Sequence, residues 1–301
     1  MKVPPTPALT GAPWRGIVMA LLVGMSFATN TSLAALSFRG GATPLAVLLA
    51  RSSVAFILLF VLLGALGIRR TLPPARRRGA VLLGCVFCTY SYGVIYAIQH
   101  LPVGLVVSTF YTFPLLVALI EWGSGRQAFS RRTALGLLSA FVGILLALDV
   151  FGAPIHGLGI GLCLFGALGV SIVMTFSAKV RGDGDSRPVT LHMLGTALVV
   201  FTSLAVLQGG VGLPTTAQAW AALCGSALFY SFGIICLFVV VAKIGPVKAS
   251  LIMNIEPATS VLLGYLLLDQ RLAPQQLFGI ALIVSAVLVV ESTKLRLASR
   301  A

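Results

Sequence analysis

A short polar stretch inside an apolar part of the chain carries the groups best suited to ligand chemistry. Asn254, Glu256 and Pro257 lie near the start of an apolar run from residue 249 to residue 268. A carboxylate in hydrocarbon has no water to solvate it, so it needs a partner or a wet cavity. Proline removes a backbone donor and kinks or breaks a helix. The stretch therefore predicts a bent or broken helix at a buried polar site.

Glu256 has two interpretations at this site. It binds a substrate amine or takes up a proton, or it is a helix-end acid that hydrogen-bonds the backbone freed by Pro257. Asn254 lies about 200° around the helix from Glu256, so both face one cavity only if the helix unwinds at the proline. Both residues are included in the predicted substrate site.

Two basic side chains also lie inside apolar segments. Arg51 offers a planar fork that matches a carboxylate, and it equally suits a structural pair or a side chain that extends outward to the membrane surface. Histidine can relay protons, so His192 is, with Glu256, a candidate for proton coupling. The alternative for His192 is a helix-end histidine close to the membrane surface.

Hydroxyl-bearing side chains recur in the middle of other apolar segments. Ser108 and Tyr111 are three residues apart and share one helical face. Buried tyrosines need partners for their hydroxyls. Two interpretations are open for Tyr90, Tyr111 and Tyr230: they line a cavity for an apolar or aromatic group, or they form hydrogen bonds between helices. The predicted substrate-binding set is Arg51, Tyr90, Ser108, Tyr111, Tyr230, Asn254 and Glu256.

The composition places these residues in a membrane protein. The 301-residue chain is 58% hydrophobic and 9% charged, whereas soluble domains carry about 25% charged residues. Five cysteines lie in apolar runs, which argues against a disulfide framework. Cys85 and Cys88 have no further Cys or His at a matching depth, so we expect no metal site and no cofactor.

Ten apolar segments are long enough to span a bilayer, which takes roughly 20 residues. They lie at about 14–37, 43–66, 79–99, 102–121, 133–150, 155–178, 189–208, 217–241, 246–268 and 274–292. The short connections leave no room for a separate soluble domain. The predicted fold class is therefore an all-α membrane protein with ten transmembrane helices.

The Lys and Arg residues set the predicted orientation. With the N-terminus in the cytoplasm, all 21 basic residues except Arg39, Arg51 and Arg271 fall in cytoplasmic segments. The net charge of +14 is then explained by anionic lipid headgroups, and a nucleic-acid partner is not expected. We predict a multi-pass protein of the cell inner (plasma) membrane with both termini cytoplasmic. The oligomeric state is left open, a monomer included.

Two prolines mark an internal repeat. Tyr111-Thr-Phe-Pro114 matches Asn254-Ile-Glu-Pro257, and Gly136 and Gly279 follow their prolines at the same distance. The pattern predicts two five-helix copies, residues 1–152 and 153–301, with equivalent helix bends at Pro114 and Pro257. Because five is odd, the second copy enters from the opposite side, and such inverted repeats bind substrate near the bilayer midplane.

On these motifs the chain resembles the EamA-like branch of the drug/metabolite transporter superfamily. The second half carries the segments 255–257, 264–268 and 269–272, and the first half carries a Pro114 version with Gly136 and Gly143. The resemblance covers essentially the whole chain and implies two EamA-like five-helix repeats in an inner-membrane carrier. The turn 269–272 is close to the family's acidic turn, whereas the equivalent 125–128 lacks the acid and Glu121 does not align with it.

The resemblance implies a secondary transporter, most often an exporter of amino acids or related metabolites, that works by alternating access and is not an enzyme. Its partners are then a small-molecule substrate and the lipid bilayer. The chain has no Walker-type loop, so coupling would use a proton or substrate exchange. Alternatives are export of nucleobases or cationic drugs, an integral-membrane enzyme for lipid-linked substrates, and a passive channel.

Overall fold

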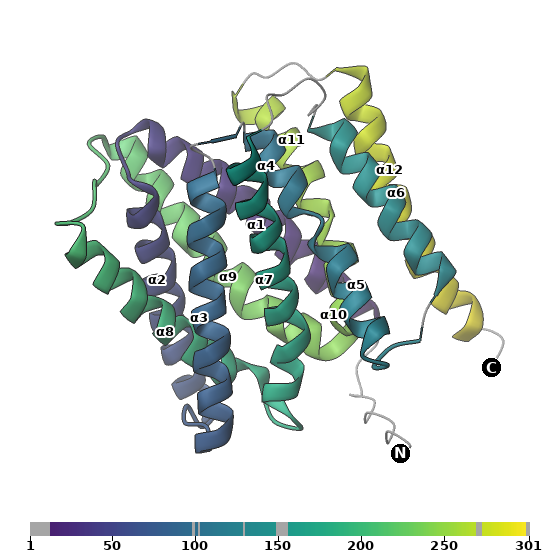
Figure 1. Ribbon diagram of the computed structural model, residues 1–301, viewed down its shortest axis with the longest axis horizontal. Coiled ribbons are helices and arrows are strands. Elements are labelled where there is room, and N and C mark those ends of the chain that lie inside the picture. The colour runs from purple at the N-terminus through teal and green to yellow at the C-terminus, as the bar shows by residue number, and fades with distance from the viewer. Residues whose placement is uncertain are drawn as a thin grey trace.

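A computed structural model describes residues 13–97, 100–101, 103–128, 130–148, 156–268 and 273–298. The regular elements in these ranges are all helices, and most of them stand side by side as long rods (Figure 1). In chain order they are α1 (Pro13–Arg39), α2 (Pro44–Ala65), α3 (Pro74–Ala97), α4 (Val103–Phe110), α5 (Phe113–Gly123), α6 (Arg131–Ala147), α7 (Gly157–Arg181), α8 (Ser186–Leu207), α9 (Ala217–Ile244), α10 (Pro246–Met253), α11 (Ile255–Leu268) and α12 (Pro274–Ala298).

These helices correspond to the ten predicted spans. Eight spans are single helices, the fourth is the pair α4 and α5, and the ninth is the pair α10 and α11. In the described part of the chain, seven segments are individually long and apolar enough to cross a membrane, including Leu105–Gly123 across the first break. The all-helical membrane fold predicted from composition and apolar length is confirmed.

Both broken spans are interrupted beside a proline. Pro114 and Pro257 lie in the first turns of α5 and α11, where a helical N–H has no partner within its own helix. Just before them, the Asn254 N–H donates to the Leu251 carbonyl at 3.1 Å, three residues back instead of four, and Thr112 does the same to Thr109 at 3.2 Å. Each break is therefore one tightened turn and not an unwound segment.

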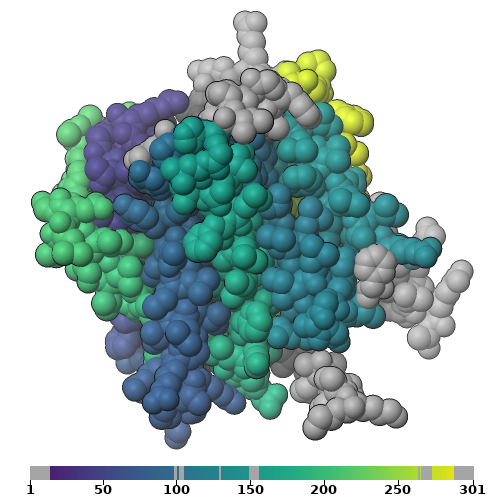
Figure 2. Space-filling view, viewed as in Figure 1, coloured from purple at the N-terminus to yellow at the C-terminus, as the bar shows by residue number. Residues whose placement is uncertain are grey.

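The helices of the two halves pack reciprocally. Helix α1 packs against α9, and their counterparts α7 and α3 also pack together, side by side near the centre of Figure 2. Likewise, α2 packs on α9, and its counterpart α8 packs on α3. Helix α1 also contacts the half-helices α10 and α11, and its counterpart α7 contacts the half-helices α4 and α5. Two inverted repeats related by a two-fold axis produce this exchange. The predicted boundary near residue 152 lies outside the described residues, so that division stays a prediction.

Helices α6 and α12 approach each other through two glycines. A Cβ added at Gly279 would stand 2.5 Å from the Gly143 carbonyl oxygen and 2.5 Å from the Ala147 nitrogen. The Gln276 side-chain amide also donates to the Ala147 carbonyl at 3.2 Å. Small residues permit this backbone contact, as they do at other membrane helix interfaces.

The connection between α7 and α8 is held by an acid cap. The Asp185 carboxylate accepts the Arg187 N–H at 2.9 Å at the start of α8 and also pairs with the Arg187 side chain. Partial burial acts to raise the pKa of Asp185, but the hydrogen bonds from Arg187 outweigh it and lower that pKa. This turn is a helix cap and does not gather acids into a site.

Candidate substrate site

The two helix breaks meet at the centre of the molecule. Helix α5 packs against α10, and the Tyr111 hydroxyl lies close to the Glu256 carboxylate across the two halves. Tyr111 is buried and Glu256 is half-buried. The acid therefore has the internal partner that an ionisable group inside a membrane protein needs.

Asn254 adds an unused acceptor beside the acid. The residue is 1% exposed, and its side-chain oxygen has no hydrogen-bond partner among the described residues. A buried polar atom without a partner costs about 1–3 kcal/mol, so its retention calls for an explanation. Because the turn at Asn254 stays helical, with φ −59° and ψ −7°, the unwinding that would let Asn254 and Glu256 face one cavity squarely does not occur.

Arg51 lies against aromatic rings instead of an acid. Its guanidinium carbon stands 4.7 Å from the centroid of the Tyr230 ring, a cation–π contact, and Tyr90 lies within electrostatic range of both. The Arg51 Nε is buried and has no hydrogen-bond partner among the described residues. The guanidinium thus keeps donor capacity for a carboxylate.

Aromatic rings connect the Arg51 end of this region to the Glu256 end. Ring centroids are 6.4 Å apart for Tyr90 and Phe110 and 6.1 Å apart for Phe110 and Tyr111. A run of neighbouring side chains therefore extends from Arg51 through Tyr230, Tyr90, Phe110 and Tyr111 to Glu256, which we call the central cluster. Helices α2, α3, α4, α9 and α11 contribute to it, with Tyr111 in the turn that ends α4.

Four phenylalanines of this region are absent from the predicted set. Phe27 packs on Tyr230 and Phe87 on Tyr90, with centroids 6.0 and 5.5 Å apart. Phe110 and Phe113 lie 5.5 Å apart at the first break. The chain has 17 phenylalanines, most of them in apolar segments, so residue type alone could not single these out. Their position next to the predicted tyrosines and Pro114 is the available signal.

Two predicted residues bond within their own helices. The Ser108 hydroxyl donates to the Leu105 carbonyl at 3.1 Å. The His192 Nδ1 lies 2.8 Å from the Pro188 carbonyl oxygen, one turn earlier. These bonds fit the structural interpretations of both residues and do not tie them to the central cluster.

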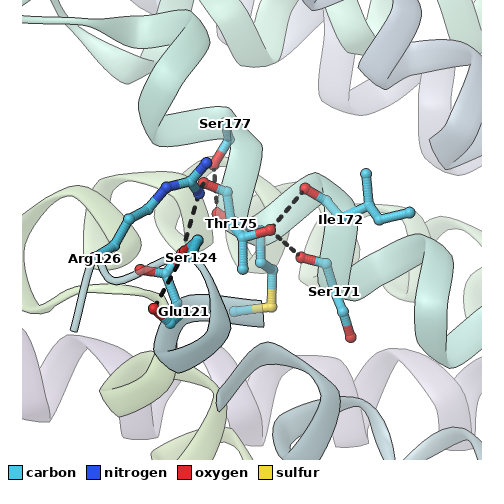
Figure 3. Close-up of polar contacts among 8 residues, drawn as sticks. Glu121, Ser124, Arg126, Ser171, Ile172, Thr175 and Ser177 are labelled. Carbon is cyan, nitrogen blue, oxygen red and sulfur yellow. Dashed lines mark hydrogen bonds and ion pairs between the residues drawn. The ribbon is translucent and has the colours of Figure 1, made fainter. Parts of the chain in front are cut away.

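A second polar cluster links the end of α5 to α7 (Figure 3). The Arg126 Nη1 lies 3.4 Å from a Glu121 carboxylate oxygen and 3.5 Å from the Thr175 carbonyl oxygen, and the guanidinium carbon stands 4.8 Å above the Phe176 ring. The Glu121 side chain is only 8% exposed. We call Glu121, Arg126 and Thr175 the α5–α7 latch. Sequence comparison of the two repeats showed only that the turn 125–128 lacks an acid. It did not reveal the latch, because Glu121 lies before this turn, within α5.

The contacts of the four half-helices differ between the two ends of the bundle. Helix α5 packs on α10, whereas their counterparts α11 and α4 have no comparable contact in the described part of the chain. Near the first break, the Ser171 hydroxyl of α7 donates to the Phe113 carbonyl at 3.1 Å.

The described residues contain no group of three or more His, Cys, Asp or Glu that could hold a metal. The predicted turn at 269–272 lies outside the described residues.

Comparison with known proteins identifies the family. Residues 14–148 and 157–292 each match the EamA-like transporter family. The chain belongs to the EamA-like transporter family. This EamA-like protein is accordingly a multi-pass membrane transporter of the drug/metabolite transporter superfamily, as its resemblance indicated.

Individual relatives are distant. The chain is 25% identical over 219 residues to "Uncharacterized transporter sll1319" of Synechocystis sp. (strain ATCC 27184 / PCC 6803 / Kazusa), covering 70% of this chain and 66% of that protein. It is 25% identical over 232 residues to "Protein PecM" of Dickeya dadantii (strain 3937), covering 72% and 73%. A solved structure described as "Crystal structure of protein" has a TM-score of 0.77 at 15% identity, covering 94% of this chain and 99% of that one. That likeness shows a shared fold.

Proposed function

We propose that this EamA-like transporter exports amino acids or related zwitterions across the inner membrane by alternating access. The observation that carries the proposal is the central cluster, which has the Arg51 cation at one end and the Glu256 carboxylate at the other. Buried donor and acceptor atoms remain free at Arg51 and Asn254 among the described residues. A ligand with both a carboxylate and an amine matches both ends.

The chemistry of the ends favours a zwitterion over a singly charged solute. A carboxylate accepts the guanidinium fork of Arg51. The amine donates to Glu256, so that neither charge stays unpaired in a low-dielectric site. The aromatic faces between them suit an apolar or aromatic side chain. A cationic drug would leave Arg51 without a charged partner, and a neutral nucleobase would leave both ends without one.

The proposed orientation places both termini in the cytoplasm. It follows from the Lys and Arg distribution, and it puts the α5–α10 contact and the α5–α7 latch on the cytoplasmic side. Alternating access then requires these inner half-helices to separate while the outer half-helices close.

Transport by purified protein in liposomes tests the proposal. We expect saturable uptake of a labelled amino acid with counterflow, inhibited by other amino acids more than by nucleobases or cationic drugs. Arg51→Gln should lower uptake by roughly tenfold or more, because hydrogen bonds to charged groups contribute about 1.5–3 kcal/mol.

Arg39→Gln is the matched control, since Arg39 is an exposed arginine at the end of α1. Wild-type protein that moves no amino acid under any imposed gradient would refute the function. Normal transport by Arg51→Gln would refute the assigned site while leaving the function standing.

A further inference from the structure

A cavity of about 250 Å³ lies away from the central cluster, between the start of α2, the end of α3 and the turn after α8. Its walls include Pro44, Leu45, Tyr92, Tyr96 and Gln208. At about 30 Å³ per water in the liquid, this volume equals roughly eight waters. It therefore has room for a small solute or for part of a larger one.

The chain path places this cavity at the outer end of the bundle. Helix α3 ends near the cavity and leads to the start of α4, whereas the α5–α10 contact and the latch lie at the far ends of those spans. Tyr96 is 41% exposed, and Gln208 is exposed as well. A solute can thus reach these walls from the side opposite the latch.

Two helices lead from this cavity to the central cluster. On α2, Pro44 and Arg51 are seven residues apart, so they share a face and Arg51 lies roughly 10 Å deeper. On α3, Cys88 lies one turn below Tyr92, and it is within electrostatic range of Tyr230, the ring that Arg51 covers. The cavity therefore stands directly outside the Arg51–Tyr230 pair.

The walls have the chemistry of a site for a planar, uncharged group. The Tyr92 and Tyr96 rings are nearly parallel, at 9°, with centroids 6.5 Å apart. The Gln208 amide donates to the Tyr92 hydroxyl at 3.3 Å, which leaves the hydroxyl proton and the Gln208 carbonyl for a ligand. Among the described residues that line the cavity, none is Lys, Arg, Asp or Glu. Aromatic faces with neutral donors and acceptors bind aromatic rings better than isolated charges.

The cavity wall is held in place by backbone bonds between the two repeats. The Thr43 N–H donates to the Gly212 carbonyl at 2.9 Å, and the Gly212 N–H donates to the Thr43 hydroxyl at 3.2 Å. The Thr215 N–H likewise donates to the Gly40 carbonyl at 2.9 Å. These bonds fasten the turn after α8 to the start of α2, so the cavity is preformed, as small-molecule sites usually are.

We propose that this cavity is an outer binding station for solutes that carry an aromatic or heteroaromatic ring. Its place on the route between Arg51 and the outer medium rests on the proposed function, whereas ring binding itself does not. The station deepens that function by favouring zwitterions with aromatic side chains. Solutes leaving the central cluster would pass Tyr92 and Tyr96 before release.

Direct binding tests the station without requiring transport. The probe is radiolabelled indole, a neutral heteroaromatic molecule, added to the full-length protein in lipid nanodiscs with empty nanodiscs subtracted. We expect saturable binding that weakens by roughly fivefold in Tyr96→Ala and in Gln208→Ala, as the loss of one aromatic contact or neutral hydrogen bond would produce. Both residues are exposed, so these variants should fold.

Two control variants locate the bound indole. Tyr265→Ala removes a tyrosine that is 50% exposed on α11 and should bind indole as the wild type does. Arg51→Gln alters the central cluster and reports any indole that binds there instead. Absence of saturable binding, or loss of binding in Arg51→Gln with retention in Tyr96→Ala, would overturn the proposal. Indole binding by protein that transports no amino acid would keep the station and refute the proposed function.

Discussion

At the break between α4 and α5, the residues three and one positions before the proline are Tyr111 and Phe113. At the break between α10 and α11, the equivalent residues before Pro257 are Asn254 and Glu256. The first pair is aromatic and buried, and the Phe113 carbonyl is bonded by a hydroxyl from α7. The second pair holds the Glu256 carboxylate and the Asn254 amide oxygen, and the amide oxygen has no hydrogen-bond partner among the described residues. The two repeats thus share a helix break beside a proline and differ in the side chains at that break.

This difference shows how an inverted repeat can build an asymmetric site. Because the halves are inverted, both breaks meet at the centre, where Tyr111 of one lies close to Glu256 of the other. The two neighbours are not equivalent positions, since the counterpart of Glu256 is Phe113 and the counterpart of Tyr111 is Asn254. One repeat therefore supplies the charge, and the other supplies its neutral partner and the aromatic surface.

Glu256→Gln should have the largest effect among changes at the two breaks. Gln keeps the size of the side chain and can still bond Tyr111, but it cannot pair with a substrate amine. We expect amino acid uptake in proteoliposomes to fall by about 10- to 100-fold, because hydrogen bonds to charged groups contribute about 1.5–3 kcal/mol.

The control for this change is Phe113→Leu at the equivalent position of the first break, which should leave most of the uptake intact. Equal losses in the two variants would show that the chemical difference between the breaks has no part in transport.

Tyr111→Phe should have an intermediate effect, since it removes only the hydroxyl that lies beside Glu256. A neutral hydrogen bond contributes about 0.5–1.5 kcal/mol, so we expect uptake to fall by roughly 2- to 10-fold with the fold intact. Tyr265→Phe, an exposed tyrosine on α11, serves as the control. A loss as large as that of Glu256→Gln would mean that the first break carries as much of the binding as the second.

Arg126→Gln should have the smallest effect and acts on stability. The latch belongs to the first repeat alone, because Gly264 stands where Glu121 would be in the second. Partly exposed ion pairs contribute about 0–1 kcal/mol, so we expect a small fall in the free energy of unfolding in detergent.

Arg132→Gln, at an exposed site on α6, is the control for the latch. The double variant with Glu121→Gln and Arg126→Gln should lose less unfolding free energy than the two single variants lose in sum, because each single change removes the same interaction. Strictly additive losses would show that the two side chains do not act as a pair.

Much of the fold could be predicted from local signals. Apolar segments of bilayer length marked the helices, and the prolines marked where two spans are interrupted. The site was harder. Arg51, Tyr90, Tyr111, Tyr230 and Glu256 were named from their rarity within apolar segments, and the structure brings them into one chain of contacts. Ser108 and His192 were named by the same reasoning, yet their bonds stay within their own helices.

The sequence by itself determined the membrane class, the number of spans, the two interruptions and the family, because each depends on residues close together along the chain. Only the tertiary structure decided that Tyr111 lies beside Glu256, that Arg51 covers Tyr230 and that Glu121 reaches Arg126. Those contacts depend on which helix faces meet. Helix packing sets those faces through small residues such as Gly143 and Gly279, and a hydropathy pattern does not encode them.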